Sequence, residues 1–208
     1  MKQYLAIDIG GTAVKLGIVD ETGAVGPKAE ESVNFDGYQT PVLDTVRKAA
    51  KEFLTAQAIP VESLAGIGVS ATGQIDSRKG IVAGTCGNFP NYINSPIQAE
   101  LERLFGLPVT VANDANCMTL GEVWVGGAKG YTDVIGVTLG TGVGGGILTG
   151  GRSLHLRCHR LLGALRRYHG SGTGRTGKGP GLERRPRHFC CRRGWQQDRS
   201  GPAGCLDG

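Results

Sequence analysis

The chain changes character near residue 150, and this change decides which part of it can fold around a core. Residues 1–150 carry 10 basic and 15 acidic side chains, whereas residues 151–208 carry 13 basic and only 3 acidic ones. The second part is rich in arginine and glycine and holds all four histidines and four of the six cysteines. It offers few residues able to form a core. The folded unit is therefore expected in the first part.

The beginning of the chain alternates apolar runs with turn residues. Residues 4–9 and 13–19 are expected to form strands joined by a glycine turn, and a third strand is expected near residues 24–33, which makes an antiparallel meander. A helix is expected to follow, with Thr40 as its N-cap and Pro41 at its first position. The pattern predicts an α/β fold.

The middle of the chain continues this alternation. Residues 64–70 form a nearly uninterrupted apolar run, which is typical of a strand in a parallel sheet. Residues 95–98 have the pattern of a capping box, and the helix that follows is expected to end at Gly106. A strand is then expected at 108–112 and a helix from Asn113 to about residue 125. A strand, a helix and a further strand in this order predict a crossover connection.

Two more strands, at 133–139 and 144–148, resemble the first two at an offset of 130 residues. Gly140 corresponds to Gly10, and Gly144 corresponds to Val14. Each pair consists of a strand, a glycine turn and a strand. Glycine hairpins are common, so this match indicates an internal duplication only when it is considered together with the motifs.

Three motifs stand in a characteristic order: DIGGTAVK at 8–15, NDAN at 113–116 and LGTGVGGG at 139–146. Together they resemble the ROK family of sugar kinases and sugar-responsive repressors, over about residues 3–152. The resemblance implies an actin/hexokinase-like (ribonuclease H-like) two-lobed α/β fold. Residues 1–128 would form a largely complete first lobe and residues 129–152 the start of the second. Residues 153–208 would be a basic tail, disordered or out of frame, in place of the rest of the second lobe.

Both glycine hairpins suit phosphate binding, because backbone N–H groups without obstructing side chains can approach phosphate oxygens closely. The resemblance implies two facing clamps around the ATP phosphates. Their residues are Gly10, Gly11 and Thr12 in the first hairpin and Gly140, Thr141 and Gly142 in the second.

Two charged residues flank the first clamp. Asp8 would hold the Mg²⁺ ion that bridges the phosphates, through water, although an aspartate beside a turn also has an ordinary structural explanation. Lys15 could neutralise phosphate charge, but a lysine on a solvated strand face explains it as well.

The second motif supplies the expected catalytic group. Asp114 would be the general base that accepts the proton of the sugar hydroxyl, and the resemblance implies that Asn113 and Asp114 bind the sugar. Both residues would also serve as caps of the following helix, and the two roles are compatible. Weaker matches at 70–76 and 87–92 add Gly73 and Asn88 to the sugar site, where ordinary loop chemistry is the alternative.

The resemblance ends soon after the second hairpin. Relatives continue with a Glu-x-Gly-His segment and a cysteine-rich zinc motif, but Ala164 and Arg167 stand near the expected glutamate and histidine, and the cysteines have no zinc spacing. No zinc site is expected, and no convincing strand is expected from Ser153 onward. We explain this by a slip of the reading frame near residues 153–160. A basic arm for nucleic acid is a weaker alternative.

These observations predict an ATP-dependent hexose kinase of glucokinase type that uses Mg²⁺, with glucose as the first candidate substrate. No run of apolar residues is long enough for a membrane span, so a cytoplasmic location and no membrane partner are expected. A nucleic-acid partner is not expected, and a homodimer of the intact protein is left open. The alternatives are a ROK-type regulator without its DNA-binding domain, for which the early first strand leaves no room, and a non-catalytic fragment.

Overall fold

The computed structural model describes residues 1–85, 89–139, 143–154 and 190–193. Its larger sheet has the strand order β3-β2-β1-β4-β7. The first three strands pair antiparallel, while β4 runs parallel to β1 and β7 runs parallel to β4. This confirms the predicted meander and crossover. The strands are β1 (Gln3–Ile9), β2 (Ala13–Asp20), β3 (Val25–Ser32), β4 (Leu64–Ala71) and β7 (Val109–Asn113).

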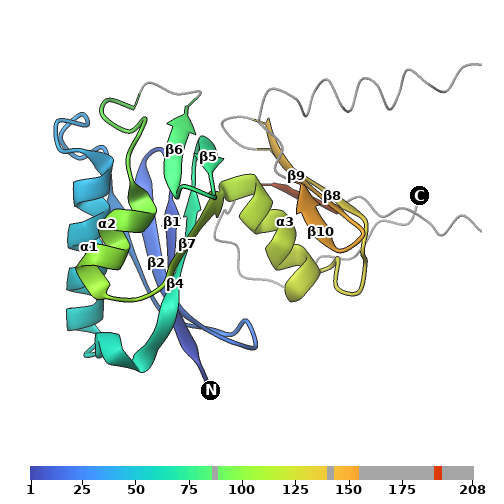
Figure 1. Cartoon of the computed structure of the whole chain (residues 1–208), viewed down its shortest axis with the longest axis horizontal. Coiled ribbons are helices and arrows are strands. Elements are labelled where there is room, and N and C mark those ends of the chain that lie inside the picture. Colours follow the sequence, from blue (N-terminus) through green and yellow to red (C-terminus); the bar gives the residue numbers. More distant parts are fainter. Residues whose placement is uncertain (86–88, 140–142, 155–189, 194–208) are drawn as a thin grey trace, which may run out of the picture.

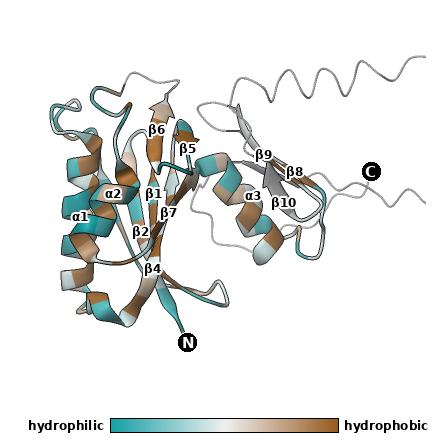
Figure 2. Cartoon of the chain, viewed as in Figure 1, coloured by the Kyte–Doolittle hydropathy of each residue, from teal (hydrophilic) through white to brown (hydrophobic). Residues whose placement is uncertain are grey.

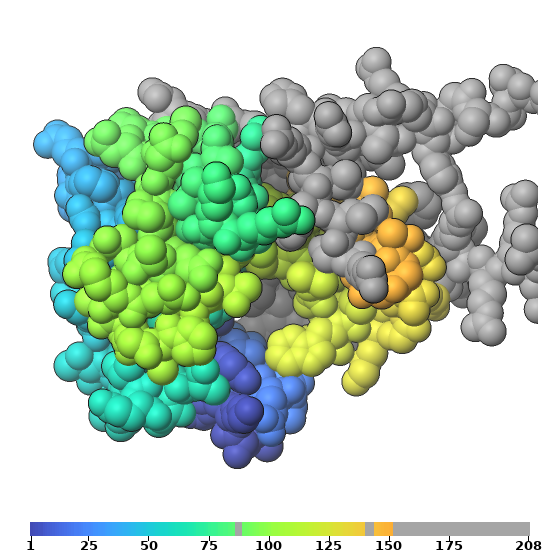
Figure 3. Space-filling model, in the orientation of Figure 1, coloured from blue at the N-terminus to red at the C-terminus, as the bar shows by residue number. Residues whose placement is uncertain are grey.

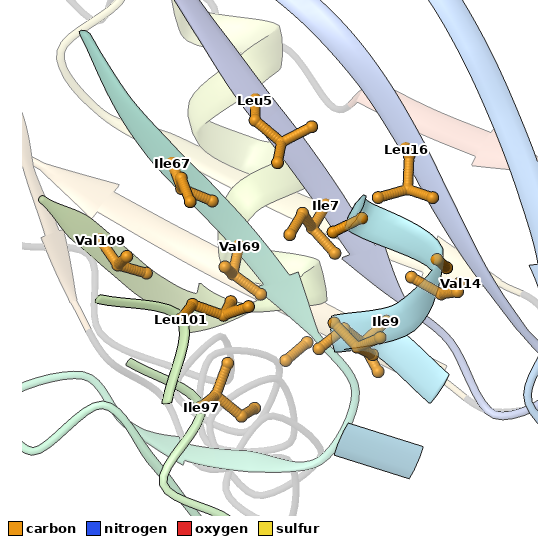
Figure 4. Packing of buried hydrophobic residues seen from close by; sticks show 14 of the residues in the cluster. Leu5, Ile7, Ile9, Val14, Leu16, Ile67, Val69, Ile97, Leu101 and Val109 are labelled. Carbon is orange, nitrogen blue, oxygen red and sulfur yellow. The ribbon is translucent and has the colours of Figure 1, made fainter. Parts of the chain in front are cut away.

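Helices α1 (Val42–Ala56) and α2 (Ile97–Phe105) lie on one side of this sheet, and α3 (Asp114–Trp124) lies on the other (Figure 1). Figure 2 shows apolar and hydrophilic residues alternating along α1, as expected of an amphipathic helix. The core forms between α1, α2 and the sheet (Figure 4). Its sheet side chains include Leu5, Ile7, Ile9, Val14, Leu16, Ile67, Val69 and Val109.

The predicted N-caps of α1 and α2 are wrong. Pro41 and Pro96 occupy the two cap positions, and neither makes a side-chain hydrogen bond to the helix. The Thr40 hydroxyl donates instead to Asp36 Oδ2 at 2.7 Å, and the Ser95 hydroxyl donates to the Asn91 carbonyl at 3.3 Å. The predicted end of α2 is confirmed, because Gly106 is its left-handed C-cap.

Two small elements beside β4 were not predicted. A 3₁₀ turn, η1 (Val61–Ser63), precedes β4. A separate hairpin of β5 (Gln74–Asp76) and β6 (Ile81–Gly84) follows it. Strands of three and four residues carry too little periodicity to be recognised.

A second sheet follows α3 and has the strand order β10-β9-β8-β11. Helix α3 packs against β8 and β9. A small apolar cluster of Ala128, Val134 and Leu148, with Val123 from α3, lies in this region. The strands are β8 (Val134–Leu139), β9 (Val143–Thr149), β10 (Arg152–Leu154) and β11 (Cys190–Arg193).

The expectation that no convincing strand occurs from Ser153 onward is wrong, because β10 includes Ser153 and Leu154 and a further strand, β11, follows. It pairs parallel to β8, on the side of β8 that β9 does not occupy. Strand pairing uses backbone groups, so a segment without apolar periodicity can complete a sheet edge. The proposed disorder or frame slip of residues 155–189 and 194–208 lies outside the described residues.

Within the described ranges, no helix is long and apolar enough to cross a membrane.

Candidate functional site

The end of β1 brings Asp8 to the side of the sheet opposite α1 and α2. Successive strand residues face opposite sides, so Ile7 and Ile9 enter the core while the half-buried Asp8 points away from it. In register, Asp8 stands between Lys15 on β2 and Ser70 on β4. Ser70 donates a hydrogen bond from Oγ to Asp8 Oδ1 at 2.7 Å. No ion pair joins Lys15 to Asp8, and Lys15 is exposed.

The turn after β1 presents unused backbone donors. The Gly10 N–H closes the turn by donating to the Ala13 carbonyl at 2.9 Å, and the Thr12 carbonyl accepts from the Val33 N–H at 2.9 Å. In the part of the chain that the structure describes, no acceptor meets the N–H of Gly11 or of Thr12. Two adjacent free N–H groups in a glycine turn can hold an anion.

Asn113 organises the junction between β7 and α3. Its Oδ1 accepts from the N–H groups of Ala115 at 3.1 Å and Asn116 at 3.3 Å, which makes it the N-cap of α3. Its Nδ2 donates to Asp114 Oδ1 at 2.7 Å and to the Gly73 carbonyl at 2.8 Å. Both amide hydrogens of Asn113 are therefore engaged, and the side chain fixes the Asp114 carboxylate and the Gly73 loop together.

The environment of Asp114 favours its protonated form. Desolvation by the surrounding protein is the largest cause and raises its pKa, and the negative charge of Asp8 raises it further. Hydrogen bonds from the Ala115 N–H and from Asn113 act in the opposite direction. Asp114 is nevertheless exposed in the first turn of α3, where a substrate can reach it. A carboxylate with a raised pKa that stays accessible is suited to accept a proton.

Sequence reasoning missed several residues that support this site. Cys117, one turn after Asp114 on α3, interacts with Ser70, and burial raises the pKa of its thiol to about 11. Tyr92 is fully buried, and its pKa is raised by burial and by the charges of Asp114 and Asp8. The contact of Ser70 with Asp8 follows from the pairing of β1 with β4, and this register is not visible in the sequence.

The predicted site residues are partly brought together. Asp114 interacts electrostatically with Asp8 and accepts a hydrogen bond from Asn113, and Gly73 joins them through Asn113. On the face that Figure 3 shows, the surface is hollowed between the blue atoms of the N-terminal strands and the yellow atoms of the segment that follows β7. Four predicted residues, Asn88, Gly140, Thr141 and Gly142, lie outside the described residues.

The possible ligands near Asp8 suit Mg²⁺ held partly by water and phosphate better than a metal ion held by protein side chains alone. In the described ranges, no group of three histidine, cysteine, aspartate or glutamate side chains could hold a metal ion. Asp8 keeps one carboxylate oxygen without a hydrogen-bond donor among those residues and lies beside the free N–H groups of the turn. Mg²⁺ is commonly held by one carboxylate together with water and substrate phosphates.

The strand order, the glycine turn and the paired carboxylates define the actin/hexokinase-like class of two-lobed α/β proteins. The ROK family model matches residues 4–156, and the chain belongs to the ROK family.

Curated relatives resemble the same region. The chain is 33% identical to a glucokinase of Thermotoga maritima over 149 residues, which are 72% of this chain and 45% of the relative. It is 38% identical to a beta-glucoside kinase of Klebsiella pneumoniae over 143 residues, 68% of this chain and 44% of the relative. The chain therefore spans about half the length of the curated relatives it matches.

A solved structure resembles the fold. A ROK family glucokinase from Streptomyces griseus, in complex with glucose and AMPPNP, has a TM-score of 0.62 and 29% sequence identity. The similarity covers 74% of this chain and 47% of that one.

Proposed function

We propose that this chain carries the sugar-binding part and the first phosphate-binding turn of an ATP-dependent hexose kinase of glucokinase type. The observation that carries the proposal is Asp114, an accessible carboxylate with a raised pKa that Asn113 ties to the Gly73 loop. The glucokinase and beta-glucoside kinase relatives support a sugar as the acceptor. Glucose is the first candidate.

In the proposed reaction, Asp114 accepts the proton of a hexose hydroxyl while that oxygen attacks the terminal phosphorus of ATP. The new O–P bond forms as the bond to the leaving ADP oxygen breaks, which yields a hexose phosphate, ADP and a proton. The Gly11 and Thr12 N–H groups would bind phosphate oxygens. Asp8 would hold Mg²⁺ through water, and the bound ion would neutralise phosphate charge.

The remaining predicted residues complete this proposal. Gly140, Thr141 and Gly142 would form the second phosphate clamp, and Asn88 would contact the sugar. Lys15, which is exposed on β2, would contribute positive charge near the phosphates. The lobe boundaries at about residues 128 and 152, the cytoplasmic location and a dimer of the intact protein remain parts of the proposal.

The test uses the purified 208-residue chain with MgATP and a panel of glucose, mannose, N-acetylmannosamine and cellobiose. Sugar phosphates are detected by mass spectrometry, and hexose binding is followed by saturation-transfer NMR. Asp114→Asn is the control variant, because it keeps an oxygen that accepts hydrogen bonds but cannot take the proton. Sugar-phosphate formation that falls at least about a hundredfold in the variant supports the kinase.

The second candidate is a non-catalytic sugar-binding protein, as in the sugar-responsive repressors of the ROK family. Hexose binding without phosphate transfer would support this candidate and overturn the kinase proposal for this chain. If no hexose binds, both candidates are wrong.

A further inference from the structure

Three aromatic rings connect the glycine turn to the loop at Gly73. Tyr38 and Phe89 meet edge to face with ring centroids 5.7 Å apart, and Phe89 meets Tyr92 in the same way at 5.9 Å. The Tyr92 hydroxyl donates to the Thr72 carbonyl at 3.2 Å. We call these three residues the aromatic bridge. Edge-to-face contacts fix ring positions, so the bridge links both loops through defined geometry.

At one end of the bridge, two contacts converge on Gly11. The Tyr38 hydroxyl donates to the Gly11 carbonyl at 2.6 Å. The Phe89 ring lies so close to Gly11 that an added Cβ would stand 2.9 Å from its Cζ atom. Only glycine leaves room for this ring at residue 11.

The hydrogen bond from Tyr38 also fixes the direction of a neighbouring donor. The Gly11 carbonyl and the Thr12 N–H belong to one peptide group, which is trans, so they point in opposite directions. With the carbonyl held by Tyr38, the Thr12 N–H is aimed away from the aromatic ring. This is one of the two N–H groups that meet no acceptor among the described residues.

Tyr38 occupies its position in an unusual backbone conformation. Its φ is 63°, in the left-handed region that residues with a side chain seldom adopt. Nearby, Asp36 Oδ2 accepts from both the N–H and the hydroxyl of Thr40, at 2.8 and 2.7 Å, which closes the loop that carries Tyr38. A strained residue held by its surroundings indicates that the position of its side chain matters.

We propose that Tyr38 is a positioning residue for phosphate binding: its hydroxyl holds the Gly11–Thr12 peptide so that the Thr12 N–H faces a phosphate oxygen of the nucleotide. The inference rests on the proposed function, because it assumes that the glycine turn binds phosphate. It adds a residue outside the three motifs and assigns it to the phosphate subsite rather than to the sugar subsite.

The test is Tyr38→Phe in the full chain, which keeps the ring and removes the hydroxyl. Magnesium tripolyphosphate is titrated against ¹⁵N-labelled protein, and the amide signals of Gly11 and Thr12 are followed by NMR. We expect the Kd of the variant for magnesium tripolyphosphate to rise about 3- to 10-fold, the effect of one net hydrogen bond. The chemical-shift change of the Thr12 amide on binding should become smaller. Hexose affinity should stay nearly unchanged, and the melting temperature should fall no more than in Tyr92→Phe, which also loses one hydrogen bond.

Tyr92→Phe is the matched control, because it removes a hydroxyl from the same bridge without touching Gly11. Its Kd for magnesium tripolyphosphate should stay within about twofold of the native value.

Equal affinity in the native chain and Tyr38→Phe would overturn the inference while leaving the proposed function intact. A parallel loss of hexose affinity and melting temperature in Tyr38→Phe would show a merely structural role and overturn it too. If tripolyphosphate does not shift the Gly11 and Thr12 amides of the native chain, both the inference and the phosphate turn of the proposed function are wrong.

Discussion

At the scale of single residues, the two carboxylates of the site lie in different surroundings. Asp8 is stabilised by a hydrogen bond from Ser70, whereas Asp114 has its pKa raised by desolvation and by the charge of Asp8. The fold therefore places Asp114 in surroundings that disfavour its ionised form. Such a cost is typical of residues placed for chemistry rather than for stability.

This cost predicts a pH-dependent effect of Asp114→Asn on stability. Because the folded-state pKa of Asp114 is raised, the native chain loses stability as the pH rises from the unfolded-state value, near 4, through the folded-state value. The variant lacks this loss. Its melting temperature relative to the native chain should therefore increase between about pH 3 and pH 7, in thermal melts followed by circular dichroism.

Asp20→Asn provides a control of opposite sign. The Thr22 hydroxyl donates to Asp20 and holds its pKa below the ordinary value, so Asp20 contributes stability above that range that is lost at low pH. The melting temperature of this variant should fall relative to the native chain as the pH rises. The same trend in both variants would contradict the environment described for Asp114.

A second residue-scale prediction concerns Cys117. With a pKa of about 11, only about one thiol in a thousand is ionised at pH 8, compared with roughly a quarter for an ordinary cysteine. Alkylation by iodoacetamide, followed at Cys117 by peptide mass mapping, should be slow at pH 8 and should still accelerate above pH 9. Ser70→Ala should slow it further, because the hydrogen bond with Ser70 lowers this pKa. Labelling at the rate of an ordinary cysteine at pH 8 would contradict the burial of this thiol.

Sequence motifs identified Asp8, Asn113 and Asp114 because the relevant groups are adjacent in the chain or belong to a known pattern. Ser70 and Tyr38 were missed because their partners lie 62 and 27 residues away. Strand register creates the first contact and loop closure creates the second, and neither leaves a local signal in the sequence.

At the scale of elements, the strands of the large sheet and all three helices were predictable from apolar periodicity. The start of α3 at the Asn113 cap was also predicted, but the starts of α1 and α2 were not. Thr40 and Ser95 have the right chemistry for caps, but tertiary partners, Asp36 and the Asn91 carbonyl, take their hydroxyl groups. A capping pattern states what a side chain can bind locally and not which acceptor the fold brings nearer.

Two glycines predict opposite effects of the same substitution. Gly106 ends α2 with a φ of 67°, whereas Gly121 lies within α3, and an added Cβ would meet nothing within 4 Å at either position. Gly106→Ala should therefore destabilise the fold by about 1 kcal/mol through backbone strain. Gly121→Ala should stabilise it by roughly 0.5–1 kcal/mol through helix propensity. Urea unfolding measures both, and effects of equal sign would show that the two backbones do not differ as described.

The two glycine hairpins also differ in length. In the first, Ile9 pairs with Val14, whereas in the second Leu139 pairs with Val143, so the second turn is one residue shorter. The sequence correspondence at an offset of 130 therefore does not extend to the pairing register, which differs by one residue. Sequence alignment alone could not show this, because a register is a relation between strands.

At the scale of the whole molecule, family resemblance was predictable for the first three quarters of the chain and the match over residues 4–156 confirms it. The β5–β6 hairpin and the pairing of β11 with β8 could not be predicted. The β5–β6 hairpin forms its own sheet from strands too short to show periodicity, and the pairing of β11 depends on the edge that β8 offers.

The frame hypothesis gives a prediction at this scale. If the reading frame slips near codons 153–160, another frame of the gene should encode a Glu-x-Gly-His segment followed by clustered cysteines. Resequencing codons 145–208 and translating all three frames checks this. The absence of both features from every frame would show that the basic segment belongs to the chain.

Strand β1 carries the core and the proposed chemistry in alternate positions. Leu5, Ile7 and Ile9 are buried among the helices, while Asp8 faces the opposite side. Substitutions can therefore change one set without the other, so this strand can evolve new specificity while keeping its packing. The deletion of a single codon before Asp8 would instead change both sets at once, because it would turn the carboxylate toward the apolar side and expose the isoleucines. In natural variation of this strand, we expect substitutions to be tolerated and length changes to be eliminated.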